Sequence, residues 1–388
     1  MPFFSFVLNN NVPTNELNLL KDNSILLESN KKYFSKNTKV WKLLNSNNFK
    51  SRLKFLRQEK HTHIGKKTNK ILFCLPPSVG LGDVIEYGLG VKAIEMQNLF
   101  LKVGLAFCEP AICILKNEFN LKNIYGDFIS EDEMKEYDGV FHFTSQIQKL
   151  DSNKTQRQNI EELIIKYFKV SPYRNKISIK NKRIKRVSIF PISKSPIRTL
   201  PSYILNDIIK YLDGQKLYID LILDHSSIIS NEIEKKLELN NIKLYSPKNL
   251  YELNKYIKDI EFGIFCDSGP LHLAKLYNKK GLLISTSVNA EKLISNLDQI
   301  ISYNVRYSSN FCEAPCGLTN IINFNGKHGC YDSLQKTNKI VMRDANKNIL
   351  HRGDLPKSYK YFINNPVGCI KSIDIYMIKE LIKKSLNH

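Results

Sequence analysis

The sequence predicts an α/β protein made of two domains, each built on a parallel sheet. Its 388 residues exceed what a single hydrophobic core usually covers. Short apolar runs typical of buried strands alternate with segments whose apolar residues recur at helical spacing. This alternation stops in a basic, polar stretch at residues 174–186 and then begins again. The order strand, helix, strand is the pattern of parallel α/β units, so two such domains are the simplest reading.

The first parallel domain is predicted over residues 69–180, after a basic N-terminal extension. Residues 1–68 are rich in Asn, Lys and Ser and show only short apolar patches, so a partly helical extension is expected. From residue 69 on, compact apolar strands are expected at 70–76, 102–108 and 139–144, with a helix at 82–97.

The second domain, residues 181–345, has the clearer alternation. Strands are expected at 187–192, 217–223, 242–246, 262–267 and 281–286, and helices at 203–212, 231–239, 250–260 and 270–278. Residues 346–388 form a tail that ends in an amphipathic helix. We expect this helix to pack on the first domain, with attachment to a membrane surface as the alternative.

The charge balance and the absence of long apolar runs limit the classes of function. A formal net charge of +21 favours an anionic partner. Heavy use of Lys, Asn and Ile throughout the chain spreads this charge, and no RNP, zinc-finger or helix-turn-helix pattern is present, so no nucleic-acid partner is expected. No apolar run approaches the roughly 20 residues that span a bilayer, and the N-terminus lacks a basic leader. We expect a cytoplasmic protein, with peripheral attachment to the inner face of the membrane left open.

The stretch FCDSGPLHLAKL, residues 265–276, is the most informative candidate site. In parallel sheets ligands bind at the carboxyl ends of the strands, and here a buried strand ends at Asp267 and runs directly into a helix. Gly269 permits close approach of a ligand, and free N–H groups near Ser268 can hold a diphosphate. His272 falls in the first helical turn. The alternative is that the polar side chains only cap the helix and that His272 packs internally.

Residues 248–286 resemble the family 9 glycosyltransferases, which include the ADP-heptose:lipopolysaccharide heptosyltransferases. The hallmark of that family is matched position by position by Asp267, Ser268, Gly269, His272 and Ala274. The resemblance implies a GT-B fold, in which two Rossmann-like domains with parallel sheets face a cleft. It also implies that the second domain binds a nucleotide-diphospho-sugar through these residues.

Two further segments resemble the same family. In residues 76–94 the resemblance makes Asp83 the catalytic base and places Ser78, Gly80 and Gly82 in an acceptor-side loop of the first domain. This chain departs from the family in its long N-terminal extension and in the prolines of this loop. An ordinary helix-start carboxylate is the alternative for Asp83.

Residues 190–201 resemble the segment in which a basic residue reaches the nucleotide phosphates. Arg198 aligns best and Lys194 is the alternative. Both could instead be solvated surface cations.

The resemblance implies an inverting, metal-independent transfer of heptose or a similar sugar to a cell-surface glycan such as lipopolysaccharide core. Asp83 would take the proton of the acceptor hydroxyl, and the amides of Ser268 and Gly269 with Arg198 or Lys194 would stabilise the departing diphosphate. No paired-carboxylate motif suggests a divalent ion, so no cofactor is required. The alternatives are a GT-B-like sugar-nucleotide epimerase or hydrolase, and a protein (autotransporter-type) heptosyltransferase.

A cysteine-rich loop, residues 311–331, belongs to none of these motifs. It places Cys312, Cys316 and Cys330 close together, with His328 near the last of them. The C-x3-C spacing is looser than paired CxxC motifs, so reduced thiols near the donor pocket are the simpler reading. Zinc or iron ligation is the alternative, because some autotransporter heptosyltransferases that resemble this family carry a cysteine-bound iron.

Overall fold

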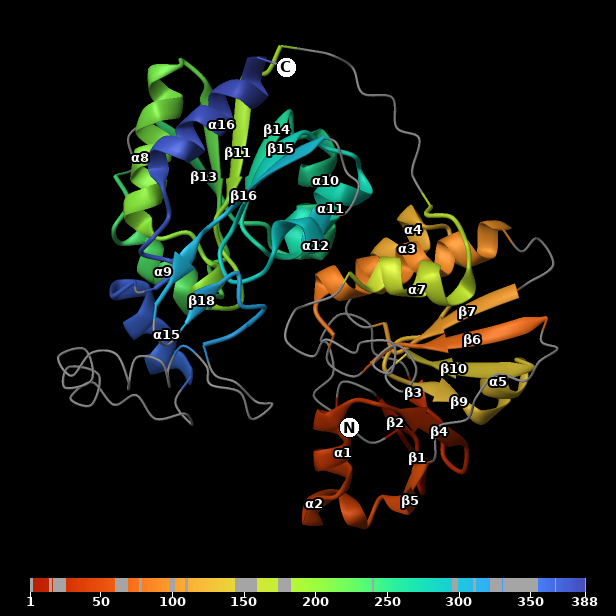
Figure 1. Ribbon diagram of the computed structural model, residues 1–388. Helices are drawn as coiled ribbons and strands as arrows, with labels where there is room; N and C mark the ends of the chain where they lie inside the picture. Colours follow the sequence, from red (N-terminus) through yellow and green to blue (C-terminus); the bar gives the residue numbers. More distant parts are fainter. Residues whose placement is uncertain are drawn as a thin grey trace. The chain divides into compact units, whose positions relative to one another are not determined.

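The computed structural model divides into two compact units, which are described here one at a time (Figure 1). One unit comprises residues 1–152 and 160–173, and the other comprises 153–159 and 174–388. The structure describes residues 3–13, 16, 26–59, 69–76, 79–97, 102–108, 111–143, 159–173, 183–238, 241–294, 299–309, 312–321, 330, 355–366 and 368–387. Of the predicted site residues, Ser78 and His328 lie outside these ranges.

The second unit is built on a six-stranded sheet with the order β13-β12-β11-β14-β15-β16. All neighbouring strands in it are parallel, which confirms the predicted α/β class. The strands are β11 (Arg186–Phe190), β12 (Tyr218–Ile222), β13 (Ile242–Tyr245), β14 (Phe262–Phe265), β15 (Gly281–Ser285) and β16 (Ile300–Asn304). The strand order reverses between β11 and β14, and such a switch point is where parallel sheets bind ligands.

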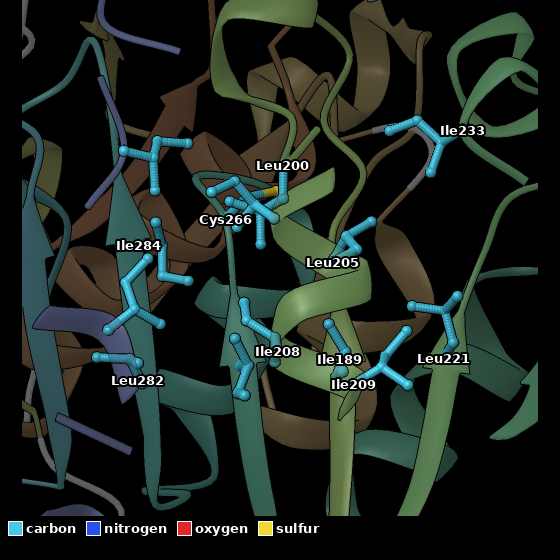
Figure 2. Packing of buried hydrophobic residues seen from close by; sticks show 14 of the residues in the cluster. Ile189, Leu200, Leu205, Ile208, Ile209, Leu221, Ile233, Cys266, Leu282 and Ile284 are labelled. Atoms are coloured by element: carbon cyan, nitrogen blue, oxygen red, sulfur yellow. The ribbon is translucent and has the colours of Figure 1, made fainter. Parts of the chain in front are cut away.

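Helices pack on this sheet through apolar residues at helical spacing. In α8 (Ser202–Gly214) the buried residues include Leu205, Ile208 and Ile209, which meet Ile189 of β11 and Leu221 of β12 in one core cluster (Figure 2). The other helices of this unit are α9 (Ile228–Glu234), α10 (Leu250–Asp259), α11 (Gly269–Leu276), α12 (Ala290–Ile294), α15 (Leu355–Asn364) and α16 (Ile375–Asn387). A short hairpin, β17 (Tyr307–Ser308) and β18 (Glu313–Ala314), follows β16.

Two sequence predictions for this unit were wrong. The C-terminal helix α16 packs on α8, β15 and β16 instead of on the first domain, and it buries Ile378 and Ile382 in the second core (Figure 1). The predicted helix at 231–239 is α9 at 228–234, because Ser227 accepts a hydrogen bond from the Ser230 amide and starts the helix earlier. Among the helices that the structure describes, none is long and apolar enough to cross a membrane.

The first unit contains a four-stranded parallel sheet with the order β10-β6-β7-β8. The strands are β6 (Lys70–Cys74), β7 (Lys102–Ala106), β8 (Asn123–Ile124) and β10 (Gly139–His142), with helices α3 (Leu81–Gln97), α4 (Ile112–Glu118), α5 (Glu131–Lys135) and α7 (Ile160–Phe168). Glycines inside α3 cost helical stability but allow close packing. A Cβ at Gly90 would lie 2.7 Å from Cδ1 of Ile164 in α7, and one at Gly88 would lie 2.6 Å from Cδ2 of Leu115 in α4.

The N-terminal residues form a second sheet in this unit, where the sequence predicts a partly helical extension. Its order is β5-β1-β4-β9, all antiparallel. The elements are β1 (Phe3–Leu8), β2 (Val12–Pro13), β3 (Leu26–Leu27), β4 (Lys32–Ser35), α1 (Thr38–Leu44), α2 (Asn47–Lys50), β5 (Leu53–Glu59) and β9 (Ile129–Ser130). The strands were missed because the surrounding residues are rich in Asn, Lys and Ser and because β9 comes from a distant part of the sequence. Phe3 and Phe34 share a core cluster with Leu72 and Cys74, so this sheet packs against the parallel one.

Candidate functional site

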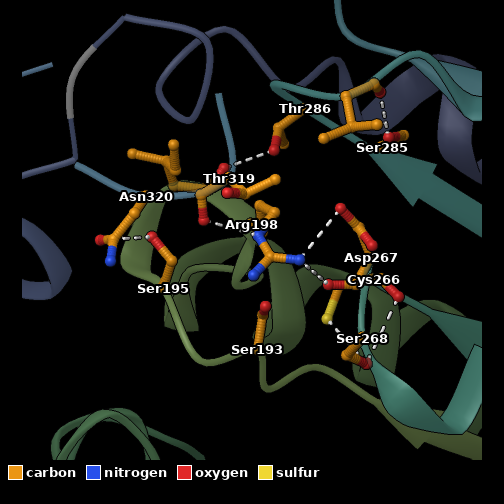
Figure 3. A network of polar contacts seen from close by, with 12 residues as sticks. Ser193, Ser195, Arg198, Cys266, Asp267, Ser268, Ser285, Thr286, Thr319 and Asn320 are labelled. Carbon is orange, nitrogen blue, oxygen red and sulfur yellow. Dashed lines mark hydrogen bonds and ion pairs between the residues drawn. The ribbon is translucent and has the colours of Figure 1, made fainter. Parts of the chain in front are cut away.

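Four segments of the second unit meet at the carboxyl end of its sheet (Figure 3). Phe190 and Phe265 are paired at the ends of β11 and β14, so the loops that follow these strands are neighbours. The loop after β15 joins them, since Thr286 donates a hydrogen bond to the Ile197 carbonyl. Residues 317–321 run across the same loops. The switch point predicted from the strand order is therefore lined by polar segments.

Arg198 is the central cation of this site. It ends a short 3-10 helix, η2 (Pro196–Arg198), and its side chain is 15% exposed. Its Nη1 donates to Oδ2 and to the backbone carbonyl of Asp267, each at 3.1 Å, and its Nε donates to the Thr319 carbonyl at 3.0 Å. Its remaining nitrogen, Nη2, has no acceptor among the residues that the structure describes. The guanidinium is thus fixed in place, and the N–H groups of Nη2 are available to a ligand.

Asp267 supports that cation from below the surface. Its side chain is 3% exposed and forms the ion pair with Arg198. A buried ion pair of this kind is costly to break from one side, because the remaining charge is left unpaired. Sequence spacing placed Asp267 at the site, and the structure adds that its carboxylate faces an arginine 69 positions away.

The turn from β14 into α11 presents backbone donors at the start of a helix. Ser268 is the N-cap residue in an extended conformation, and its side chain makes no capping hydrogen bond. Its hydroxyl instead donates to the Cys266 carbonyl at 3.4 Å. The alternative in which the Ser268 side chain caps the helix is therefore wrong. The first amides of α11 carry the partial positive charge of the helix end.

Two buried serines that sequence reasoning missed border the same loops. Ser193 follows β11 and is 4% exposed, and Ser287 follows β15 and is 1% exposed. Neither hydroxyl has a hydrogen-bond partner among the described residues. A buried, unpaired hydroxyl costs about 1–3 kcal/mol, so such groups indicate a bound ligand or water. Their position just after parallel strands, at the carboxyl end of the sheet, is the signal that could have identified them.

Lys194, Cys266 and His272 lie near the residues of this site in sequence. Lys194 is exposed and forms no ion pair with a described residue. His272 is buried at 2% exposure in α11, and its part in binding stays a prediction. Burial raises the pKa of the Cys266 thiol to about 12, so this cysteine is a neutral thiol at physiological pH.

Asp83 lies in the first unit, in the first turn of α3, as predicted. Its Oδ2 accepts the backbone N–H of Gly80 at 3.1 Å, and the N–H of Val84 donates to the Gly80 carbonyl. Gly82 is buried in the same turn. The carboxylate is half-buried at the positive end of a 17-residue helix.

The structure gathers four cysteines near this site in the second unit. Cys312 donates a hydrogen bond to Cys316, which lowers the pKa of Cys316 to about 6 and raises that of Cys312. Burial raises the pKa of Cys330, and it raises that of Cys369 to about 12. Cys369, which follows α15, was not expected in this group, but it interacts electrostatically with the other three. All four are free thiols.

Within the described ranges, no three or more His, Cys, Asp or Glu side chains are arranged to hold a metal ion. The four thiols are close enough to influence one another, but they do not form a ready-made ligand set. The metal alternative therefore gains a fourth cysteine, Cys369, beside the predicted candidates, without gaining a formed site among the described residues.

Comparison with solved structures identifies the fold. The iron-containing dodecameric glycosyltransferase TibC from enterotoxigenic E. coli H10407 aligns over 100% of this chain and 91% of its own, with a TM-score of 0.52 and 13% identity. The heptosyltransferase TibC in complex with ADP-D-beta-D-heptose aligns over 99% and 91%, with a TM-score of 0.52 and 11% identity. A glycosyl transferase family 9 protein from Veillonella parvula DSM 2008 aligns over 84% and 99%, with a TM-score of 0.51 and 10% identity.

No protein-family model and no curated protein sequence matches the chain. The similar solved structures are GT-B glycosyltransferases, and the two parallel sheets with their strand order agree with that fold. At 10–13% identity, this likeness establishes a shared fold and leaves the activity to be argued from the residues.

Proposed function

We propose that this protein is an inverting, metal-independent glycosyltransferase that moves heptose or a similar sugar from a nucleotide-diphospho-sugar to a cell-surface glycan such as lipopolysaccharide core. The observation that carries the proposal is the fixed guanidinium of Arg198. It lies at the switch point of a parallel sheet, it is held by Asp267 and Thr319, and its Nη2 has no acceptor among the described residues. A positive group fixed at that place suits a diphosphate.

The leaving diphosphate is the group that these residues stabilise in the proposed reaction. As the bond between the anomeric carbon and the diphosphate oxygen breaks, negative charge grows on that oxygen. Arg198, the first amides of α11 and the Ser193 hydroxyl supply fixed donors for this charge. Because these donors are already oriented, little reorganisation accompanies the reaction, and a divalent ion is not needed for charge compensation.

Asp267 takes a different role from the one that its motif position suggests. A carboxylate in direct contact with a diphosphate would repel it, and Asp267 is instead buried against Arg198. We therefore assign Asp267 to orienting the arginine, and Ser268 and Gly269 to the phosphate oxygens.

Asp83 is the proposed general base. One of its oxygens accepts the Gly80 amide, which fixes the carboxylate at the start of α3. From the acceptor hydroxyl it would remove the proton as the oxygen attacks the anomeric carbon, and a single displacement inverts the configuration there.

The proposal is tested by a thermal-shift panel of ADP, GDP, UDP and their sugar conjugates, repeated with Arg198→Ala and Asp267→Ala. Stabilisation by one nucleotide, lost in both variants, is the expected result, because ligands that bind the folded state raise its melting temperature. Absence of any shift in the wild-type protein would exclude nucleotide-diphosphate binding.

The acceptor is tested separately from the donor. With a donor identified, turnover in the absence of any acceptor would point to the epimerase or hydrolase alternative. Transfer to a polypeptide but not to a glycan would point to the protein heptosyltransferase alternative. Binding to anionic lipid vesicles, measured by sedimentation, decides whether the chain associates with a membrane surface.

A second candidate property is metal binding by Cys312, Cys316, Cys330 and Cys369. It is favoured by the mutual influence of the four thiols and by the description of TibC as iron-containing. Bound zinc or iron would give this region structural cross-links, since thiolates are the ligands that these metals prefer. Metal analysis of anaerobically purified protein, compared with Cys369→Ser, tests it. A metal content far below one ion per chain would remove this candidate.

A further inference from the structure

The cysteines take no part in the proposed transfer, yet the chain that carries two of them contacts the donor site. We define the cysteine-rich segment as residues 312–321. It includes β18, the second strand of the hairpin, and it ends at Ile321, next to the loop that carries Arg198 (Figure 3). The segment contacts the loops of the donor site on one side and α15 on the other.

Toward the site, the cysteine-rich segment binds the loops that follow β11 and β15. The Thr319 carbonyl accepts Nε of Arg198 at 3.0 Å, and the Gly317 amide donates to the Ser287 carbonyl at 2.7 Å. Oδ1 of Asn320 accepts the Ser195 hydroxyl at 3.4 Å. These contacts use backbone and amide groups, and none of them involves a sulfur atom.

Asn320 is the point at which the segment is joined to the rest of the unit. Besides Ser195, its Oδ1 accepts the hydroxyl of Tyr359 in α15 at 3.1 Å and the amide of Ile321 at 2.8 Å. Ile321 is fully buried in a cluster with Ile197 and Phe362. One side-chain oxygen therefore ties together the arginine loop, the segment and α15.

The four thiols lie around the same segment. Cys316 directly precedes Gly317, and Cys330 packs against the cluster that holds Ile197 and Ile321. Cys369 follows α15, the helix that supplies Tyr359. The segment therefore carries two of the thiols, and its last residue shares a cluster with a third.

We infer that the cysteine-rich segment is a positioning element for Arg198, and that Asn320 and the four thiols set its place. The inference rests on the proposed function and deepens it. Ordering a free arginine side chain costs conformational entropy, and a site that holds the side chain in advance removes that cost from ligand binding. The segment therefore acts on donor affinity without touching the donor.

Steady-state kinetics of Asn320→Ala test the inference. The donor KM should rise about tenfold, because Arg198 must then be ordered during binding, while the acceptor KM stays at its wild-type value. Asn320→Asp keeps an acceptor for all three hydrogen bonds and should recover most of the donor affinity. Asn206→Ala, which removes a side chain bridging α8 to residues 236–238, is the matched control.

A separate variant, Cys316→Ser, tests whether the thiols help to position the segment. Cys316→Ser removes one of the four thiols, the one next to Gly317. It should raise the donor KM several-fold, which is less than the rise expected for Asn320→Ala. Cys113→Ser changes a partly exposed cysteine of the other unit and should leave the donor KM unchanged. A wild-type donor KM in both Asn320→Ala and Cys316→Ser would overturn the inference.

A readout that needs no ligand separates this inference from the proposed function. Phenylglyoxal modifies arginine side chains, and the rate at Arg198 can be followed by peptide mass spectrometry. Release of Arg198 in Asn320→Ala should speed its modification, and Asn320→Asp should restore the slow rate. If the wild-type chain binds no nucleotide but the rates still differ in this way, positioning stands and the proposed function fails. Equal rates in all three proteins would overturn positioning even if transfer occurs.

Tyr359→Phe and Ser195→Ala serve if Asn320→Ala fails to fold. Each removes one hydrogen-bond donor to Asn320 with little change in volume. Each should raise both the donor KM and the phenylglyoxal rate by a smaller factor, and no change in either measurement would contradict the inference.

Discussion

Two strand-to-helix turns in this protein look alike in sequence and differ in their contacts. Both carry glycine and an aspartate between a buried parallel strand and the first turn of the helix that follows it. Asp83 accepts a hydrogen bond from Gly80, three positions away, whereas Asp267 pairs with Arg198, 69 positions away. The Asp83 carboxylate is half-buried in the first turn of α3, where it is the proposed base. A buried ion pair commits the carboxylate to its partner, so equal motifs acquire different roles.

The largest effect expected from this comparison is that of Asp83→Asn. An amide can still accept the Gly80 N–H but cannot act as a base, so kcat should fall by about 10²–10⁴ while the donor KM and the melting temperature stay near wild type. Transfer assays with the identified donor check this. Asp132→Asn, in the first turn of α5, changes a similar helix-start carboxylate and should have no effect. Full activity of Asp83→Asn would remove it as the base.

Arg198→Lys tests the other turn. Lysine keeps the positive charge but lacks the planar fork that meets Asp267 and Thr319 at the same time, so kcat/KM should fall about 100-fold. Arg186→Lys, an exposed arginine at the start of β11, is the control. Unchanged kinetics for Arg198→Lys would mean that charge alone matters at this position and that the fork does not.

Ser193→Ala sharpens the comparison by separating binding from stability. Loss of a phosphate ligand should weaken nucleotide-diphosphate binding by about 3–10-fold, measured by calorimetry. Because the hydroxyl has no partner among the described residues, its removal should leave the free energy of unfolding unchanged or slightly increased. Ser226→Ala, at an exposed serine, controls for the substitution itself. Weaker folding together with unchanged binding would assign the hydroxyl a structural role.

Lys36 makes a long-range contact with the segment that follows β6. We expect its contribution to the free energy of unfolding to depend on pH. Its Nζ donates to the Leu75 carbonyl at 2.9 Å, just after β6, and burial lowers the pKa of this amine to about 8. The unfolded chain binds the proton more tightly than the folded one, so the burial penalty is present below that pKa and is relieved above it. The free energy of unfolding should therefore rise by about 1 kcal/mol between about pH 7.5 and 9.

The control for this pH effect is Lys36→Met, which should lack the rise. Burial raises the pKa of the neighbouring Cys74 thiol to about 12, so that thiol stays neutral over the same range. Denaturant unfolding curves at a series of pH values measure both proteins. Parallel pH profiles for the wild type and Lys36→Met would show that Lys36 is not responsible.

Much of the second unit could be predicted because its signals are local. Apolar runs and helical spacing identified β11, β12, β13, β14 and β15 with the helices between them, and the same reasoning located the turn at Asp267. The N-terminal sheet could not be predicted in this way, because β1 pairs with β4 and β5 across long separations and β9 comes from beyond residue 128.

The sequence by itself determined the parallel α/β class, the strand-to-helix turns and the candidate site residues at those turns. Only the tertiary structure decided that Arg198, and not Lys194, pairs with Asp267, that Cys369 joins the other cysteines, and that α16 packs on the second sheet. The physical reason is that periodicity and capping depend on neighbours along the chain. Ion pairs and thiol clusters depend instead on the strand order, which brings distant segments to one edge of a sheet.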